Sequence, residues 1–248
     1  VVVYYTNFQT KATSQAAGEV YSAFLGNFYA DNTDGDTFGP HYRSASIRWD
    51  FSFHTIDLEA RRSFAIAPNL TVRPFVGLKT AFIDQSVSSQ WNQPIDTSEK
   101  TYQFNSATEH LEQNFWGIGP SLGVTLEVPW YTGPRHTLKL FGTPSGSLMY
   151  GHWTFQDLYT NDGPTSPTVP TTTSIAIDTS PITGASTMVS GVVGVEWNQI
   201  FSRATTTVRF GYESQIWLNQ MQFYSYNMGR LNNLTSLHGG VLELSINY

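Results

Sequence analysis

The stretch from Phe115 to Val128 reads FWGIGPSLGVTLEV, and it decides the fold. Its even-numbered residues, from Trp116 to Val128, are all apolar, while its odd-numbered residues from Gly117 to Glu127 are Gly, Ser, Thr or Glu. A period of two indicates a β-strand with one apolar face. Strands of soluble sandwiches usually have about 5–6 residues, and a tilted strand needs about 9–11 to cross a bilayer. The length of this stretch therefore favours a strand that spans a membrane.

The same alternation recurs in six other segments, so the chain is predicted to be all-β. They lie near residues 47–60, 70–83, 137–155, 187–198, 206–219 and 241–248. In the first of them the apolar residues change from odd to even positions near His54, and a β-bulge there would explain the change. Two further strands are expected, one within 1–6 and one within 20–30.

Short and long connections alternate along the chain. The short ones are 61–69, 129–136 and 199–205, and the long polar ones are 84–112, 156–186 and 220–234. In an antiparallel up-and-down barrel this order puts short periplasmic turns at one end and long extracellular loops at the other. Residues 1–248 are thus predicted to form a single transmembrane β-barrel with eight to ten visible strands, or ten to twelve if native N-terminal residues are missing before Val1.

Charged and aromatic residues on these strands suggest an interior and two membrane interfaces. Twelve charged residues fall opposite the apolar face and are predicted to line the pore: Arg48, Asp50, Asp57, Glu59, Arg73, Lys79, Glu127, Lys139, Glu196, Arg209, Glu213 and Glu243. Aromatic girdles flank the apolar band of such barrels. The candidates for these girdles are Trp49, Trp116, Trp130, Tyr150, Trp197, Tyr212 and Tyr248.

Composition excludes several other classes. Only 13% of the 248 residues are charged and 15% are aromatic, which is the opposite of a disordered chain. The net charge of -6 argues against a nucleic-acid partner. The chain has no Cys, so thiolate metal sites are excluded. No run approaches the roughly 20 apolar residues of a transmembrane helix.

Four short motifs resemble the Legionella-type major outer-membrane protein family, which is also found in chlamydia-like bacteria. They are NFWGIGP at 114–120, RPFVGLK at 73–79, DLE at 57–59 and GYESQIWLNQ at 211–220. The resemblance covers roughly 42–248, and residues 1–41 diverge from the family pattern. It implies a pore-forming barrel in the outer membrane of a Gram-negative-type bacterium, with no catalytic residues and no cofactor.

The last strand carries a further resemblance. Tyr248 ends the chain, with Leu242, Leu244 and Ile246 at alternate positions before it. This pattern is similar to the C-terminal assembly signal of bacterial outer-membrane barrels, which implies the barrel-assembly machinery as a partner. The lipid bilayer and lipopolysaccharide are the other expected partners, and a homo-oligomer of the chain is a further expectation.

Candidate chemical sites are weak. His54 near Asp57 and Glu59 suggests a metal or acid–base cluster, and His152 near Asp157 a second one, but solvated strand and loop positions explain both. No Ser is expected in the strained turn that a hydrolase's G-x-S-x-G motif forms, because GPSLG at 119–123 lies within the alternating strand 115–128. The acidic stretch 32–36 lacks the spacing of a calcium-binding loop and is interpreted as a turn. We therefore expect no enzyme activity and no metal.

Three functions remain open at this stage. The leading one is a passive diffusion pore for ions and small hydrophilic solutes, with a weak cation preference because seven of the twelve interior charges are carboxylates. The second is a non-conducting structural or surface-adhesion barrel whose long loops bind host or neighbouring molecules. The third is a soluble carbohydrate-binding sandwich.

Overall fold

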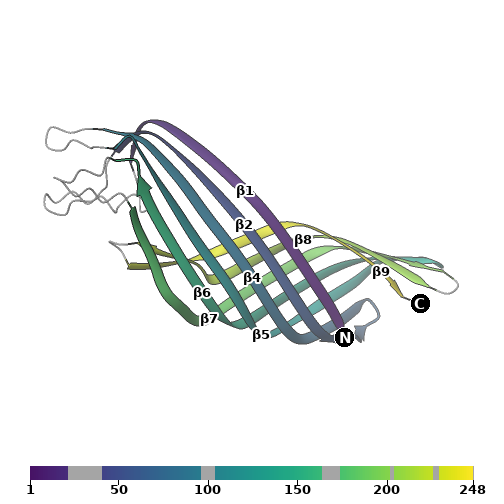
Figure 1. The fold of residues 1–248 in the computed structure, drawn as a ribbon. Helices are drawn as coiled ribbons and strands as arrows, with labels where there is room; N and C mark the ends of the chain where they lie inside the picture. The colour runs from purple at the N-terminus through teal and green to yellow at the C-terminus, as the bar shows by residue number, and fades with distance from the viewer. Residues whose placement is uncertain (22–40, 96–103, 164–173, 202–203, 226–228, 248) are drawn as a thin grey trace.

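One antiparallel sheet contains all the strands of the structure. The computed structural model describes residues 1–21, 41–95, 104–163, 174–201, 204–225 and 229–247. The strands are β1 (Val2–Tyr21), β2 (His41–Arg61), β3 (Phe64–Ala67), β4 (Leu70–Pro94), β5 (Ser106–Thr132), β6 (His136–Asn161), β7 (Ser174–Ile200), β8 (Thr205–Ser225) and β9 (Gly229–Asn247). Their order is β1-β2-β4-β5-β6-β7-β8-β9, and β3 pairs with β4. The sheet curls into a half-barrel, which confirms the predicted all-β, up-and-down architecture (Figure 1).

The strands are longer than the sequence pattern predicted. Residues 84–94 and 106–112, expected in a loop, belong to β4 and β5 and are paired as far as Asn92 with Ser106. The predicted loops 156–186 and 220–234 likewise contain the ends of β6, β7, β8 and β9. In these outer portions the outer face of the sheet is largely polar, and the inner face combines polar residues with a small buried cluster of Tyr42, Trp91, Phe104, Ala107 and Tyr159. The alternation of hydrophobicity is therefore lost there, although the backbone ladder continues.

The structure differs from two predictions about the first strands. The strand predicted within 1–6 is present but longer, since β1 extends to Tyr21. The strand predicted within 20–30 falls almost entirely on residues 22–40, which lie outside the described residues. The β-bulge predicted near His54 is absent, since β2 pairs with both neighbours without a register shift from Ser44 to Glu59. The change in hydrophobic phase therefore reflects the side chains and not the backbone.

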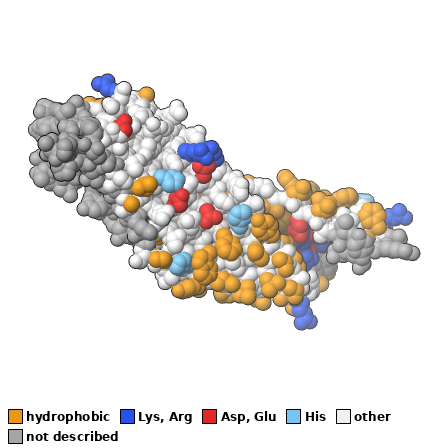
Figure 2. Space-filling view, in the orientation of Figure 1, with side chains coloured by type: hydrophobic (Ala, Val, Ile, Leu, Met, Phe, Trp, Pro, Cys, Tyr) orange, Lys and Arg blue, Asp and Glu red, His pale blue; other side chains and the backbone are white. Residues whose placement is uncertain are grey.

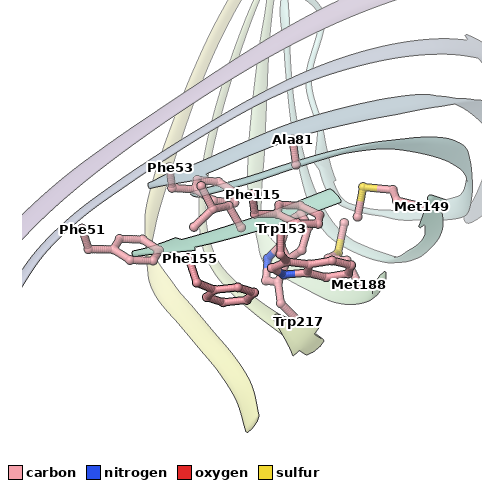
Figure 3. Close-up of a cluster of buried hydrophobic side chains, with 10 residues drawn as sticks. Phe51, Phe53, Ala81, Phe115, Met149, Trp153, Phe155, Met188 and Trp217 are labelled. Atoms are coloured by element: carbon pink, nitrogen blue, oxygen red, sulfur yellow. The ribbon is translucent and has the colours of Figure 1, made fainter. Parts of the chain in front are cut away.

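The interior of the curled sheet holds an aromatic layer. Phe53 of β2 and Trp217 of β8 approach edge to face with ring centroids 5.4 Å apart, and Phe115 and Trp153 lie 4.8 Å apart. Because β2 and β8 are not neighbours in the sheet, the first contact crosses the interior. Figure 3 shows these side chains gathered inside the sheet. The layer comprises Phe51, Phe53, Ala81, Ile83, Phe115, Met149, Trp153, Phe155, Met188 and Trp217.

Glycines on the inner face make room for these rings. The ring of Phe115 lies over Gly117 and Gly151, and a Cβ at those glycines would come within 2.7 Å and 2.5 Å of it. Large inward rings and small inward glycines thus occupy alternate levels. This packing explains why the inner face of 115–128 contains glycine where a water-facing strand would carry polar residues.

The outer wall carries an exposed apolar band. On β5 the band runs from Trp116, 43% exposed, to Trp130, 70% exposed. Fourteen residue steps at about 3.3 Å each, tilted by about 45°, rise roughly 33 Å, close to the thickness of a bilayer's apolar core. Figure 2 shows apolar side chains over one part of the wall and a largely polar surface beyond it. Within the described residues, no helix has the length and apolarity to span a membrane.

Candidate pore interior

The end of the sheet that carries the short connections, here called the turn end, encloses a network of ion pairs. Glu127 is fully buried and forms ion pairs with three basic side chains: Arg73 at 2.8 Å, Lys139 at 2.9 Å and Arg209 at 3.1 Å. Glu196 is 2% exposed and binds Lys139 at 2.9 Å and Arg209 at 2.6 Å. Each buried carboxylate is therefore compensated by at least two cations, which is what a charge needs in order to remain ionised away from water.

Strand register brings this network together. Lys139 of β6 faces Glu196 of β7, which faces Arg209 of β8, which faces Glu243 of β9. Directly opposed residues share a face of the sheet, so the alternating charges form one row on the inner wall. Arg209 also contacts Glu243 at 3.5 Å.

A second group of charges lies on β2 and β4. Lys79 pairs with Asp57 at 2.5 Å, and Arg61 pairs with Glu59 at 2.7 Å. The guanidinium of Arg61 also lies 4.7 Å from the ring centre of Tyr4. Arg61 was not among the predicted pore residues. It occupies the same inward odd phase as Asp57 and Glu59, so an unbroken count along β2 would have found it.

A cavity of about 480 Å³ lies among these charges. Asp57, Lys79, Arg209, Glu213 and Glu243 contribute to its lining. The aromatic layer borders it, because Met188 belongs to both. The interior at the turn end is thus polar, charged and hollow, and it ends against a layer of packed rings.

Most of the predicted pore residues lie on this inner wall. They are Asp57, Glu59, Arg73, Lys79, Glu127, Lys139, Glu196, Arg209, Glu213 and Glu243. Arg48 and Asp50 are a correction. They lie on the outer face of β2 and pair with each other at 2.6 Å, because the strand has no bulge to turn them inward.

The predicted interface aromatics divide in the same way. Trp116, Trp130, Tyr150, Trp197 and Tyr212 point outward, with exposures between 43% and 70%. Trp49 is wrong as an interface residue, because it points inward and packs against the aromatic layer. Tyr248 lies outside the described residues.

Histidines accompany the outward aromatics at the edge of the apolar band. Tyr5 forms a 3.0 Å hydrogen bond with Nδ1 of His54, and Tyr212 forms a 2.6 Å bond with Nδ1 of His238. The ring of Trp116 lies against His152. Figure 2 shows histidines near the boundary between the apolar and the polar surface.

The structure does not assemble the weak candidate sites. His54 lies on the outer face of β2, whereas Asp57 and Glu59 face the interior. His152 and Asp157 likewise lie on opposite faces of β6. Among the described residues, no three His, Asp or Glu side chains are placed to hold a metal ion. The acidic stretch 32–36 lies outside the described residues.

A buried carboxyl pair lies inside the polar portion of the sheet at the opposite end, here called the loop end. Glu109 of β5 is 2% exposed, and neither of its carboxyl oxygens has a hydrogen-bond partner among the described residues. Burial, reinforced by Asp157, raises the pKa of Glu109 to about 9. Burial also raises the pKa of Asp157 to about 6. The sequence pattern missed Glu109 and considered Asp157 only beside His152, because both carboxyl groups lie in segments predicted as loops.

Comparison with protein families gives a match over nearly the whole chain. The family described as "Legionella pneumophila major outer membrane protein precursor" matches residues 1–247, including the first 41 residues, which the motifs had left outside the resemblance. No curated protein matches the chain. The inward charges, the outward apolar band and the curled antiparallel sheet agree with this match. The chain is an outer-membrane protein and belongs to the Legionella pneumophila major outer membrane protein family.

Proposed function

We propose that this protein forms a passive pore for ions and small hydrophilic solutes across the outer membrane. The observation that carries the proposal is the reversal of polarity between the two faces: apolar side chains face outward, while paired charges surround a cavity of about 480 Å³ inside. A hydrated interior lowers the cost of moving a polar solute through lipid, and the lining side chains bias which solutes pass.

The charges of the interior predict a weak cation preference. The turn end contains five cations and six carboxylates on the inner wall. They are Arg61, Arg73, Lys79, Lys139 and Arg209 against Asp57, Glu59, Glu127, Glu196, Glu213 and Glu243. The inner wall at this end therefore carries one net negative charge. The expected cation preference is weak, because the net charge is small and most of the charged groups are paired.

The aromatic layer supports a second candidate, a non-conducting structural barrel. Its rings meet across the interior at Phe53 and Trp217. Narrow barrels with about eight strands have interiors that side chains can fill. An aromatic layer that stays closed would block solutes, and the long connections at the loop end would then carry the function by binding neighbouring or host molecules.

Single-channel recording of the purified protein in a planar bilayer, with a salt gradient, separates the two candidates. We expect small, discrete current steps and a reversal potential displaced slightly toward that of a cation-selective pore. Insertion must be shown independently, by protease protection of the reconstituted protein in vesicles. A protein that is inserted but never conducts would overturn the pore and support the structural barrel.

A further inference from the structure

The two edges of the sheet are the most unusual feature for a protein in lipid. Within the described residues β1 pairs only with β2, and β9 pairs only with β8. Each free edge is a row of unpaired backbone N–H and C=O groups. Such an edge is not tolerated in the hydrocarbon region, where every backbone group must be satisfied by protein. Some strand must therefore occupy each edge in the membrane.

The direction of the strands allows the two edges to satisfy each other. The path from β1 to β9 contains eight strands, because β3 lies off it, and every neighbouring pair is antiparallel. The first and the last strand of an even-numbered path are antiparallel as well. The first residues of β1 and the last residues of β9 also lie toward the same end of the molecule (Figure 1).

Shared cavities show that the two edges already approach one another. Tyr4, Tyr5 and Thr6 of β1 line the same cavity as Val241–Leu244 of β9. A second cavity of about 380 Å³ is lined by Thr6–Phe8 together with Leu237–Gly240. The cavity that contains later residues of β1 contains earlier residues of β9, as an antiparallel pair requires.

We propose that β1 and β9 pair directly in the membrane and close an eight-stranded barrel, with Tyr4 opposite Glu243. Inner residues of β1 have even numbers and inner residues of β9 have odd numbers, as Tyr4 opposite Asp57 and the inward Glu243 show. Opposed residues share a face, so the two residue numbers in each pair must add to an odd number. The residue numbers of Tyr4 and Glu243 add to 247, an odd sum that agrees with the residues lining the first shared cavity. The same sum pairs Gly18 with Gly229 near the far ends of the two strands.

The geometry of closed barrels provides an independent check. We followed directly opposed residues from each strand to the next around the sheet. This path leads from Val2 on β1 through Gly77 on β4 and Ser147 on β6 to Thr235 on β9. In the proposed register Thr235 faces Ala12, so one circuit advances by ten residues along β1. With about 3.3 Å per residue and about 4.8 Å between eight strands, this stagger gives a strand tilt of about 41°. Closed barrels usually have tilts of about 35–45°.

Closure also determines the bore. Eight strands at this tilt give a backbone diameter of about 16 Å, in which the inward side chains of opposite walls meet. The contact between Phe53 and Trp217 shows such a meeting. This inference does not rest on the proposed pore function, but it makes the aromatic layer the narrowest level of any conducting path.

Disulfide trapping tests the register, and the chain suits it because it has no native Cys. The variant Val3→Cys/Leu244→Cys places two outward residues directly opposite each other, since 3 and 244 also add to 247. Antiparallel partners have Cα atoms about 4.5–5.5 Å apart, within the range that a disulfide bridges. We expect intramolecular crosslinking of the protein reconstituted in vesicles, seen as a shift in gel mobility that a reductant reverses.

Two control variants complete the experiment. Val3→Cys/Leu58→Cys joins residues that are already paired between β1 and β2, and it must crosslink if the method works. Val3→Cys/Gly240→Cys is displaced by four residues along β9 and should crosslink at least tenfold less than the Leu244 pair. Equal crosslinking of the Gly240 and Leu244 pairs would overturn the register. Crosslinking only in the β1–β2 control would overturn closure and indicate an additional strand at the seam, and crosslinked dimers would indicate a second copy there.

Discussion

At the scale of single residues, burial and pairing decide what each charge does. Glu127 and Glu109 lie on the same strand, β5, and both are almost completely buried. Glu127 meets three cations, whereas Glu109 has no hydrogen-bond partner among the described residues. Hence the first carboxylate is compensated inside the barrel, while the second is held in its neutral form. Replacement by Gln is therefore expected to have opposite effects on stability at these two glutamates.

Replacing Glu127 by Gln should destabilise the barrel strongly. Three cations would lose their shared carboxylate, and breaking a buried ion pair costs about 3–5 kcal/mol. The matched control is Glu243→Gln, which removes the same charge from a side chain that is 37% exposed and has one contact at 3.5 Å. We expect both variants to reduce the cation preference, measured by reversal potential. Urea unfolding in vesicles, followed by Trp fluorescence, should show the large loss for Glu127→Gln alone; equal losses would contradict the network.

Replacing Glu109 by Gln should stabilise the loop end above neutral pH. The pKa of this carboxyl is raised from 4.5 to about 9, so the folded form stays protonated while the unfolded form ionises. Its contribution is complete below pH 4.5 and is lost as the pH rises toward 9, which costs on the order of 1–3 kcal/mol at neutral pH. Asp157 adds a smaller effect of the same sign up to about pH 6.

Hydrogen exchange measures this effect locally. Amides of residues 107–111 and 156–161 should become less protected between pH 5 and pH 8 in the native protein, after correction for intrinsic exchange. Glu109→Gln should remove most of that change. The control is Glu112→Gln on the outer face of the same strand, 42% exposed, which should leave it intact. If both variants behave alike, burial of Glu109 is not the cause.

At the scale of elements, backbone proximity is what limits substitution. Neighbouring strands lie so close together at some inner glycines that a side chain cannot be added. A Cβ at Gly119 would collide with the carbonyl oxygen of Leu148 on the neighbouring strand, and a Cβ at Gly194 with that of Phe210. By contrast, nothing lies within 4 Å of a Cβ at Gly191 of β7. These positions are all glycine in the sequence, yet the structure assigns them different tolerances.

Gly119→Ala should impair folding, whereas Gly191→Ala should be tolerated. Backbone atoms cannot move aside as a flexible side chain does, so the ladder between β5 and β6 must distort locally. Refolding into lipid vesicles, read by the heat-dependent gel mobility of folded barrels, should show a several-fold lower folded fraction for Gly119→Ala. Equal yields for the two variants would show that the sheet can adjust at Gly119.

At the scale of the whole molecule, the interior has three levels. The charged cavity lies at the turn end and the aromatic layer follows. The loop end holds Glu109 and Asp157 together with a smaller buried cluster that includes Trp91 and Tyr159. Polar groups also bridge the interior beside the rings, since Gln113 of β5 donates a 2.7 Å hydrogen bond to the carbonyl of Gln220 on β8. If the protein is the pore proposed above, the aromatic layer is the level that limits solute passage.

Removing both rings that meet across the interior should open that level. In Phe53→Ala/Trp217→Ala we expect a several-fold larger unit conductance than in the native protein, because two large side chains leave the narrowest section. Each truncation also costs about 3–5 kcal/mol of stability, so folding must be verified first. Outward Phe82→Ala is the control, as it lies on the outer wall and should leave conductance unchanged. An unchanged conductance in the double variant would show that the aromatic layer does not limit the current.

The sequence by itself determined the fold class, the positions of seven strands and the inward placement of most charges. Each of these follows from period-two alternation, which is a local property of the chain. Alternation also misled the prediction at β2, where inward Phe51 and Phe53 resembled the apolar outer face and displaced Arg48 and Asp50 to the wrong side. A hydrophobic residue has the same local signature whether it faces lipid or a packed interior.

Only the tertiary structure decided which distant side chains meet. The register across the strands brought Glu127 to its three cations and Phe53 to Trp217. It also showed strands that continue through segments with no continuous apolar face, because backbone hydrogen bonds do not depend on side-chain polarity. Curvature and register are properties of the whole sheet, so the contents of the interior could not be predicted from any single strand.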